Sequence, residues 1–245
     1  MNVDFHVHTN RFVDAVHSPR QMVKQAKRSG LHAIAITDHE RLFPRNEERR
    51  LTREFGVVVI PGIEGGNIAV QKHWIALMVT RQINDVSISR ILRFIWDVGG
   101  VSIAPHPHCR PGYASYAELG FDAVEALNGT KPFSNARIRN TRSIPEVAGS
   151  DAHSLPMLGS CWTHTNADAD TGIILETVRN GRCTPTGTTI SFLDYLRFYP
   201  LHFKNQILSQ PSAAFAALCQ KIRNIRVARK QGSVRAGHAG TSGRW

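Results

Sequence analysis

Near its start the sequence reads Val3-Asp4-Phe5-His6-Val7-His8, in which apolar and polar residues alternate. Because successive side chains of a β-strand point to opposite faces, the rings of His6 and His8 fall on one face, where both can bind one ion. Asp4 precedes His6 by two residues and fits a supporting role better than ligation. A single His-x-His pair is weak evidence for a metal site, so its weight depends on the rest of the sequence.

Similar polar residues end several other short apolar runs. Asp38 and His39 directly follow Ala33-Ile-Ala-Ile-Thr37, and burying such a charged pair is costly unless it is paired or bound to metal. Imidazole and carboxylate groups suit Zn, Mn and Fe. The candidate metal ligands, in chain order, are His6, His8, Asp14, His39, Glu64, His73, His106, Asp151 and His153. A set spread so widely can converge only if the fold brings strand ends together.

Each of these residues taken alone has an ordinary structural explanation. Asp14 could be a turn residue before a helix, and Glu64, after a Pro-Gly turn, could be a solvated loop carboxylate. His73 could pack on an edge strand, and His106 could lie in a turn between its two prolines. Their order along the chain is much less ambiguous than any one of them.

Seven β-rich runs separated by helical patterns predict an α/β fold. The runs are Val3–Phe5, Ala33–Thr37, Val57–Pro61, Trp74–Val79, Val101–Pro105, Phe121–Leu127 and Glu146–Gly149. The helical patterns are Ser18–Ser29, Glu47–Phe55, Ser87–Val98, Asn135–Arg142 and Thr171–Arg179. The alternation predicts right-handed βαβ units around a parallel sheet, and seven strands favour a TIM-like barrel over an open sheet. Active sites of such barrels lie at the carboxyl ends of the strands, where most of the candidate ligands fall.

The overall composition is that of an ordinary globular protein. The chain has 245 residues, of which 42% are hydrophobic and 20% charged, enough for one domain with an appendage. No run reaches about 18 apolar residues, so no transmembrane helix is expected. Asp4, His6 and His8 stand where a signal peptide would have a positively charged start and an apolar stretch, so a cytoplasmic location is expected. The four cysteines form no Cys-x-x-Cys pair, which argues against a disulfide framework and a cysteine-rich zinc site.

The net charge of +11 is concentrated after Asp194. Nine of the 30 basic residues lie in that tail, which holds no Asp or Glu, so residues 1–194 carry 21 basic and 19 acidic residues. We predict a barrel domain over 1–194, a basic and partly helical extension over 195–231, and a disordered tail over 232–245. The extension could pack against the barrel or contact nucleic acid or an acidic membrane.

The motifs, taken in order, resemble those of the PHP (polymerase and histidinol phosphatase) family. They are Asp4-x-His6-x-His8, Thr37-Asp38-His39, Gly62-x-Glu64, His73 before an apolar strand, His106-Pro107 and Gly149-Ser150-Asp151-Ala152-His153. The resemblance covers residues 2–160. It implies a distorted seven-stranded β/α barrel with two or three divalent ions, usually Zn, Mn or Fe, that hydrolyses phosphoesters.

The resemblance also implies how the ligands are shared among the ions. One ion would be held by His6, His8, Glu64 and Asp151, a second by Glu64, His73 and His106, and a third by Asp14, His39 and His153. Around Asp14 the chain has Val-Asp-Ala where the family usually has Ser-Asp-Gly. The segment from Glu125 to Asn128, with Asn135 beyond it, resembles a family segment that we expect to support the site without binding metal.

The expected reaction is hydrolysis of a phosphomonoester, on a small metabolite or a nucleotide, by a metal-activated hydroxide. The expected catalytic residues are Glu64, Asp151 and His153. Glu64 would bridge two ions, and Asp151 or a site histidine would protonate the leaving alkoxide. The substrate-binding candidates are His108, Arg110 and Arg137, with Lys131 and Arg139 as further phosphate-binding cations.

Three other functions remain open from the sequence. A nuclease or nucleic-acid-end phosphatase would use the basic tail to hold the phosphate backbone, with a steep dependence on salt. An amidohydrolase also has His-x-His after its first strand, but usually has a longer chain and a bridging carboxylated lysine. A non-catalytic binding module is disfavoured by the complete ligand set.

Overall fold

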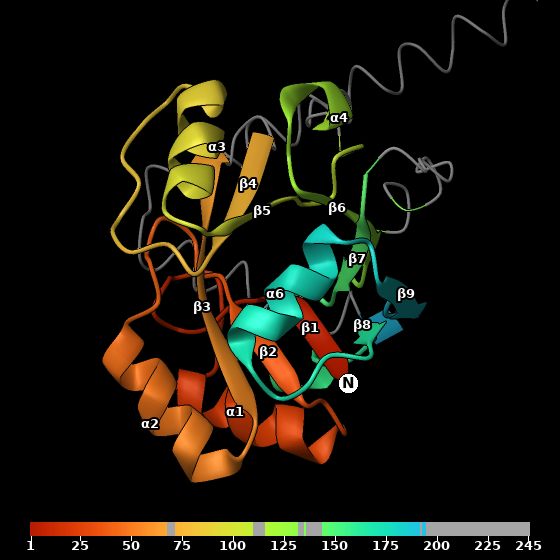
Figure 1. Ribbon diagram of the computed structural model, residues 1–245. Helices are drawn as coiled ribbons and strands as arrows, with labels where there is room; N and C mark the ends of the chain where they lie inside the picture. Colours follow the sequence, from red (N-terminus) through yellow and green to blue (C-terminus); the bar gives the residue numbers. More distant parts are fainter. Residues whose placement is uncertain (68–71, 110–115, 132–134, 136–143, 192, 195–245) are drawn as a thin grey trace, which may run out of the picture.

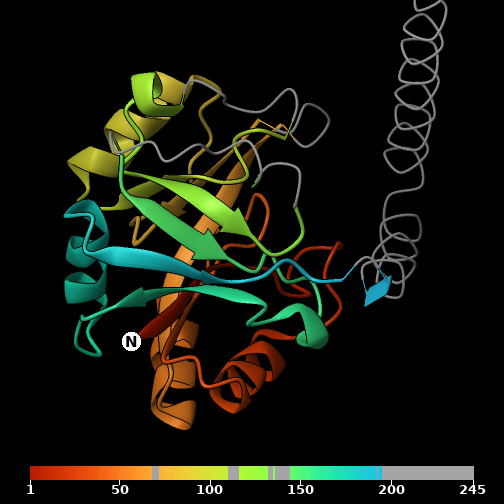
Figure 2. The same cartoon turned by 90° about the vertical axis from the view of Figure 1, so that its right-hand side faces the viewer.

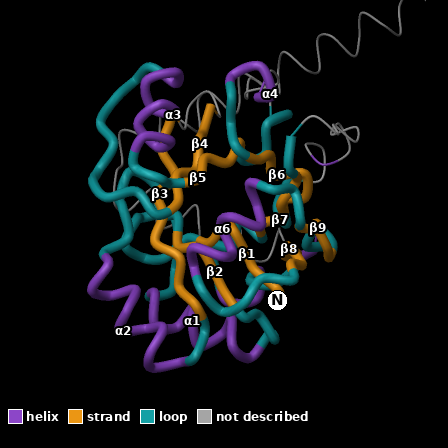
Figure 3. The backbone as a smooth tube through the Cα atoms, viewed as in Figure 1, coloured by secondary structure: helices purple, strands orange, loops and turns teal. Residues whose placement is uncertain are grey.

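A single curved sheet of nine strands forms the centre of the molecule, with helices around it (Figures 1 and 3). The computed structural model describes residues 1–67, 72–109, 116–131, 135, 144–191 and 193–194. The strands are β1 (Asn2–Val7), β2 (Ala33–Ile36), β3 (Val58–Asn67), β4 (Lys72–Leu77), β5 (Val101–Ala104), β6 (Ala123–Asn128), β7 (Glu146–Gly149), β8 (Cys161–Thr165) and β9 (Cys183–Gly187). Their order across the sheet is β7-β6-β5-β4-β3-β2-β1-β8-β9.

The helices confirm most of the predicted helical patterns. They are α1 (Pro19–Arg28), α2 (Arg45–Phe55), α3 (Ile88–Asp97), α4 (Tyr116–Leu119) and α6 (Thr171–Arg179), with a 3-10 turn η2 (Leu155–Met157). Helix α1 begins where its sequence predicts, because the Ser18 and Gln21 side chains form a capping box ahead of Pro19. The pattern predicted over Asn135–Arg142 lies outside the described residues, apart from Asn135.

All seven predicted strands are present, and the predicted α/β barrel is confirmed. The sheet is mixed, however, and not wholly parallel as the sequence suggested. Strand β4 runs antiparallel to both β3 and β5, because β3 and β4 follow each other directly in the chain without a crossover helix. The remaining pairs among β1 to β7 are parallel.

Two further antiparallel strands, β8 and β9, extend the sheet beyond β1. The sequence analysis missed them because neither is an apolar run. In β8, Cys161, Thr163 and Thr165 are buried while Trp162 and His164 face outward, so polar residues occupy both faces. Strand β9 contains Pro185, a residue that sheets tolerate at an edge.

The barrel is nearly closed. Backbone hydrogen bonds join the end of β1 to the residues that follow β7, and side chains link β7 to β8 and β9. Thr163 Oγ1 accepts a hydrogen bond from the Ala148 amide at 2.7 Å and lies 3.2 Å from the Ala148 carbonyl. The thiol of Cys183 reaches the carbonyl of Glu146 at 3.3 Å. These contacts hold β7 against β8 and β9 (Figure 2).

Three apolar clusters fill and surround the barrel. The inner cluster includes Phe5, Ile60 and Ile103 from the strands together with Ile174 and Leu175 from α6. Helix α6 therefore covers one end of the barrel, as its position across β1 and β2 in Figure 1 shows. The second cluster lies under α1 and α2, and the third lies under α3, on another part of the outer surface of the barrel.

The predicted extension over 195–231 and the predicted disordered tail over 232–245 lie outside the described residues. Within the part of the chain that is described, none of the helices has the length and apolar content needed to span a bilayer.

Candidate metal centre

All nine predicted metal ligands meet at the end of the barrel away from α6. His6 lies on β1 and Glu64 on β3, while His39, His106 and Asp151 follow the carboxyl ends of β2, β5 and β7. His73 begins its strand instead of ending one. Because β4 runs antiparallel, its first residues lie beside the last residues of β3, and His73 pairs with Gly66. The reversed strand thus brings His73 to the same end as the other candidates.

The cluster is withdrawn from solvent. Eight of the nine residues are buried, and the side chain of His153 is the most exposed of them at 14%. Burying so many ionisable groups together is costly unless each finds a partner of opposite charge or a metal ion.

Glu64 lies at the centre, with histidines on both sides of its carboxylate. Its Oε2 faces one group, with ring nitrogens of His6 at 3.2 Å, His8 at 3.2 Å and His39 at 3.3 Å. Its Oε1 faces another, with His73 at 2.9 Å and His106 at 3.4 Å. A carboxylate whose two oxygens face separate histidine groups has the geometry of a bridge between two ions.

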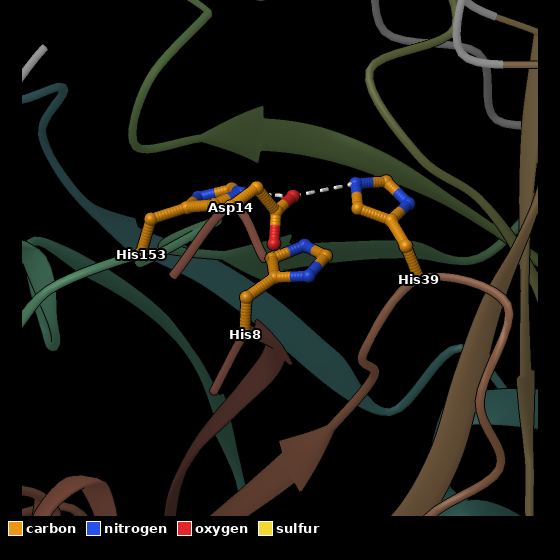
Figure 4. A group of neighbouring side chains, drawn as sticks. All are labelled: His8, Asp14, His39 and His153. Atoms are coloured by element: carbon orange, nitrogen blue, oxygen red, sulfur yellow. Dashed lines mark hydrogen bonds and ion pairs between the residues drawn. The ribbon is translucent and has the colours of Figure 1, made fainter. Parts of the chain in front are cut away.

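Asp14 is the centre of a second group of contacts, beside the group around Glu64. Its Oδ2 lies 3.2 Å from His39 Nε2 and 3.1 Å from His153 Nε2, as the dashed lines in Figure 4 show. The ring of His8 lies against the same group, stacked on His153 with centroids 4.2 Å apart. A backbone hydrogen bond from the Val16 amide to the His153 carbonyl, at 3.0 Å, holds the loop that carries Asp14 near the end of β7.

Asp151 presents two different sides. Its Oδ1 faces imidazoles, with His8 at 3.4 Å and His6 at 3.6 Å. Its Oδ2 accepts a hydrogen bond from Thr130 Oγ1 at 2.7 Å and lies 3.3 Å from Lys131 Nζ. One oxygen therefore faces the histidines, while the other contacts the two residues in the turn after β6.

Three overlapping groups of donor atoms in this cluster could hold metal ions. They are His8, Asp14, His39 and His153; His6, His8 and Asp151; and His39, Glu64 and His73. These groups differ from those implied by the family resemblance, since His8 also joins Asp14 and His39 also joins Glu64. His106 stands near the third group, 3.4 Å from Glu64.

The chemistry of the donor set fits divalent metal ions. Nδ1 of His8 and Nε2 of His73 are buried and make no hydrogen bond within the described residues. Nε2 of His6 lies 3.0 Å from Nε2 of His8, so two imidazole donors point at the same space. Buried polar atoms normally find partners, and nitrogen and carboxylate oxygen together suit Zn, Mn and Fe.

The electrostatics of the cluster keep its carboxylates ionised. Burial alone would raise the pKa of Glu64, but the surrounding imidazoles of His39, His6 and His73 outweigh it and hold that pKa well below its usual value. Burial likewise opposes ionisation of Asp151, whose pKa Lys131 and His6 hold well below its usual value. Ionised carboxylates are the form that binds metal.

A second layer of residues orients the cluster. Glu125 Oε1 lies 3.0 Å from His6 Nδ1, which leaves Nε2 of that ring facing Glu64 and His8. The other oxygen of Glu125 accepts hydrogen bonds from the His106 amide at 2.8 Å and from the Asn128 side chain at 2.7 Å. This arrangement matches the supporting position expected for the segment from Glu125 to Asn128.

The backbone is also shaped around the site. A Cβ on Gly149 would stand 2.4 Å from Cβ of His6 and 2.7 Å from Oε1 of Glu125, so only glycine fits between β1 and β6 here. His106 and Asp151 have positive φ angles of 30° and 53°, a strained conformation for residues with side chains. In this backbone conformation both side chains are directed toward the cluster, at the ends of β5 and β7.

The predicted substrate-binding residues are only partly described. His108 packs its ring edge-on against Tyr116, with centroids 5.9 Å apart. Arg110, Arg137 and Arg139 lie outside the described residues. Thr130 was not singled out from its sequence, because a threonine after a strand carries no distinctive signal. Its hydroxyl contact with Asp151 emerges only from the fold.

Comparison with known proteins identifies the family. A model of the PHP domain matches residues 4–118, and a model of a PHP-associated region matches residues 135–183. The chain is 32% identical over 142 residues to an uncharacterized protein of Methanocaldococcus jannaschii, which covers 52% of this chain and 82% of that protein. The chain belongs to the PHP family.

Solved structures share the fold of this chain. One is a two-domain protein from Bacteroides vulgatus that contains a predicted PHP-like metal-dependent phosphoesterase, with a TM-score of 0.60 and 19% identity. The match covers 80% of this chain and 68% of that one. Another is Endonuclease Q in complex with a duplex that has an abasic lesion, with a TM-score of 0.55 and 14% identity over 81% of this chain and 66% of that one. At these identities the likeness concerns the fold.

Proposed function

We propose that this PHP protein is a metal-dependent phosphoesterase that hydrolyses a phosphomonoester on a small metabolite or a nucleotide. The observation that carries the proposal is the position of Glu64, whose two carboxylate oxygens face separate groups of histidines. Two-metal phosphatases place such a bridge between their ions. Ions bound here would supply an activated water and would polarise the phosphoryl oxygens.

The residues of the cluster divide the work among themselves. Glu64 would hold two ions at a fixed separation, and His73 and His106 would complete the side that its Oε1 faces. Asp14, His39 and His153 would hold a third ion at the more exposed edge. Glu125 orients His6 through Nδ1 and so fixes which ring nitrogen faces the metals.

The leaving alkoxide needs a proton, and two residues are placed to give it. Asp151 and His153 lie at the carboxyl end of β7, and His153 is the member of the cluster that solvent reaches best. Because the cluster keeps Asp151 ionised, His153 would hold the proton when it binds no third ion, and Asp151 would act by passing on a proton from water. The ligands proposed for zinc, manganese or iron are the same nine residues in each case.

The test is metal analysis of the purified protein followed by a panel of phosphoesters. The panel contains p-nitrophenyl phosphate, its bis ester, histidinol phosphate, nucleotides and short oligonucleotides, each at two salt concentrations. We expect two or three equivalents of metal and hydrolysis of a monoester. Glu64→Gln should abolish turnover while the fold survives, whereas Glu176→Gln, on the exposed face of α6, should match the wild type. The absence of both bound metal and hydrolysis would overturn the proposal.

A nuclease or nucleic-acid-end phosphatase is the second candidate. It is favoured by the nine basic residues after Asp194, a stretch without any acidic residue, and by the fold shared with Endonuclease Q. A substrate held along its backbone loses affinity steeply as salt rises, whereas a small monoester does not. Hydrolysis of oligonucleotides that falls steeply between the two salt concentrations would select this candidate.

A further inference from the structure

The clearest cation beside the cluster is Lys131, in the turn after β6. Its Nζ lies 3.3 Å from Oδ2 of Asp151, and its side chain is 29% exposed. The side chain therefore touches a residue of the cluster and is partly exposed to solvent. No other lysine ion pair with a member of the cluster occurs within the described residues.

The turn that carries Lys131 is held firmly. Asn128 Oδ1 accepts a hydrogen bond from the Thr130 amide at 2.8 Å and lies 3.0 Å from the Thr130 hydroxyl, which donates its proton to Asp151. The Asn135 side chain accepts a hydrogen bond from the Asn128 amide at 2.9 Å and donates one to its carbonyl at 2.9 Å. A side chain rooted in such a turn starts from a defined position, which reduces the entropy lost when its end is fixed on a ligand.

The contact with Lys131 is not what orients the Asp151 carboxylate. The Asp151 oxygen that it approaches is already bound by Thr130 Oγ1 at 2.7 Å and lies 3.4 Å from the Asn128 side chain. The carboxylate is therefore oriented without the lysine. The ammonium group at that oxygen therefore contributes positive charge next to the cluster and is not needed to position the carboxylate.

We propose that Lys131 binds a non-bridging oxygen of the substrate's phosphoryl group. The proposal rests on the proposed function, because it places the phosphoryl group over the cluster, between Asp151 and the solvent. A lysine recognises phosphate as a point charge, and a charge-assisted hydrogen bond of this kind is stronger than a neutral one. The ligand class is thus a phosphate dianion or the end group of a phosphomonoester.

Binding of inorganic phosphate to the metal-loaded protein tests this assignment without turnover. Metal content is measured first, and phosphate affinity is then measured by calorimetry at equal loading. We expect Lys131→Met and Lys131→Gln to keep the metal and to lose about tenfold or more in phosphate affinity. Lys131→Arg should retain most of it. Lys24→Met, on the exposed face of α1, removes the same charge far from the cluster and should bind as the wild type.

Thr130→Val separates phosphate binding from a purely structural role. This variant removes a donor from the same Asp151 oxygen and leaves the charge of Lys131 in place. Once fully loaded with metal, it should keep its phosphate affinity. Equal losses in Thr130→Val and Lys131→Met, or loss of metal from Lys131→Met, would mean that Lys131 acts only through Asp151 and would overturn the assignment.

The two proposals can fail separately. A wild type that binds phosphate through Lys131 but hydrolyses no ester in the panel would refute the proposed activity and leave the phosphate site standing. If the wild type hydrolyses a monoester and Lys131→Met binds phosphate as tightly as the wild type, the proposed activity stands and the assignment of Lys131 is refuted. A metal-loaded wild type that binds no phosphate would overturn the assignment of Lys131.

Discussion

Nδ1 of His73 lies 2.9 Å from Oε1 of Glu64, although His73 begins its strand and Glu64 is near the end of the preceding one. The two strands form an antiparallel pair, so the start of β4 returns to the place where β3 ends. A barrel made only of parallel strands would put the first residue of each strand at the opposite end. The reversal of one strand is therefore what completes the histidine side of Glu64.

Loss of His73 should remove metal from one side of Glu64 only. For His73→Ala we expect at least about one equivalent less metal than in the wild type, and a fall in phosphoesterase activity of about 100-fold or more, because first ligands matter at least as much as their supporting residues. Elemental analysis after dialysis checks the stoichiometry. His164→Ala, at the other end of the barrel, is the control. Full metal content in His73→Ala would contradict the ligand assignment.

A weaker effect is expected when Glu125 is neutralised. Glu125→Gln keeps the side-chain shape but removes the charge that faces His6 Nδ1. Supporting residues of this kind typically change metal affinity by about 10–100-fold. We expect that loss in a competition titration against a chelator, with an unchanged far-ultraviolet spectrum. Unaltered affinity would show that Glu125 serves only to hold the His106 amide.

The sequence predicted the site better than it predicted the sheet. Histidines and carboxylates are few and chemically distinctive, so their order, together with the resemblance to the PHP family, pointed to the residues that meet around Glu64. The direction of β4 was missed because an apolar run such as Trp74–Leu77 is compatible with either direction. Strand β8 was missed because Cys161 and Thr163 are buried for their hydrogen bonds as well as for packing, and β9 because it is not an apolar run. Such pairings depend on contacts that are distant in sequence.

Gly149 should tolerate no side chain. In Gly149→Ala the new Cβ meets Cβ of His6 at 2.4 Å and Oε1 of Glu125 at 2.7 Å, so β1 and β6 must move apart. Forcing an extra methyl into a packed site costs about 1–3 kcal/mol of unfolding free energy. We expect that loss in urea denaturation, together with weaker metal binding through displaced His6. Gly172→Ala, in α6, is the matched control, and an equal result for both variants would contradict the close approach of β1 and β6.

The seam between β7 and β8 should depend on the hydroxyl of Thr163. Thr163→Val keeps the volume but leaves the buried Ala148 amide without its partner, which costs about 1–3 kcal/mol. Thr163→Ser keeps the hydroxyl and loses one methyl group, which costs about 0.8 kcal/mol. Urea denaturation at saturating metal compares the two. A valine variant as stable as the serine variant would show that this hydrogen bond does not stabilise the contact between β7 and β8.

Removal of the metal should destabilise the wild type through the same cluster. A ligand present at about 100 times its dissociation constant raises the unfolding free energy by about 2.7 kcal/mol, which corresponds to roughly 5–10 °C in Tm for a domain of this size. Differential scanning calorimetry with and without a chelator measures the shift. In Glu64→Gln the shift should shrink, because the bridge between the two histidine groups is lost while Asp14 and His153 remain. A shift of the same size in this variant would show that the stabilising ion sits elsewhere than beside Glu64.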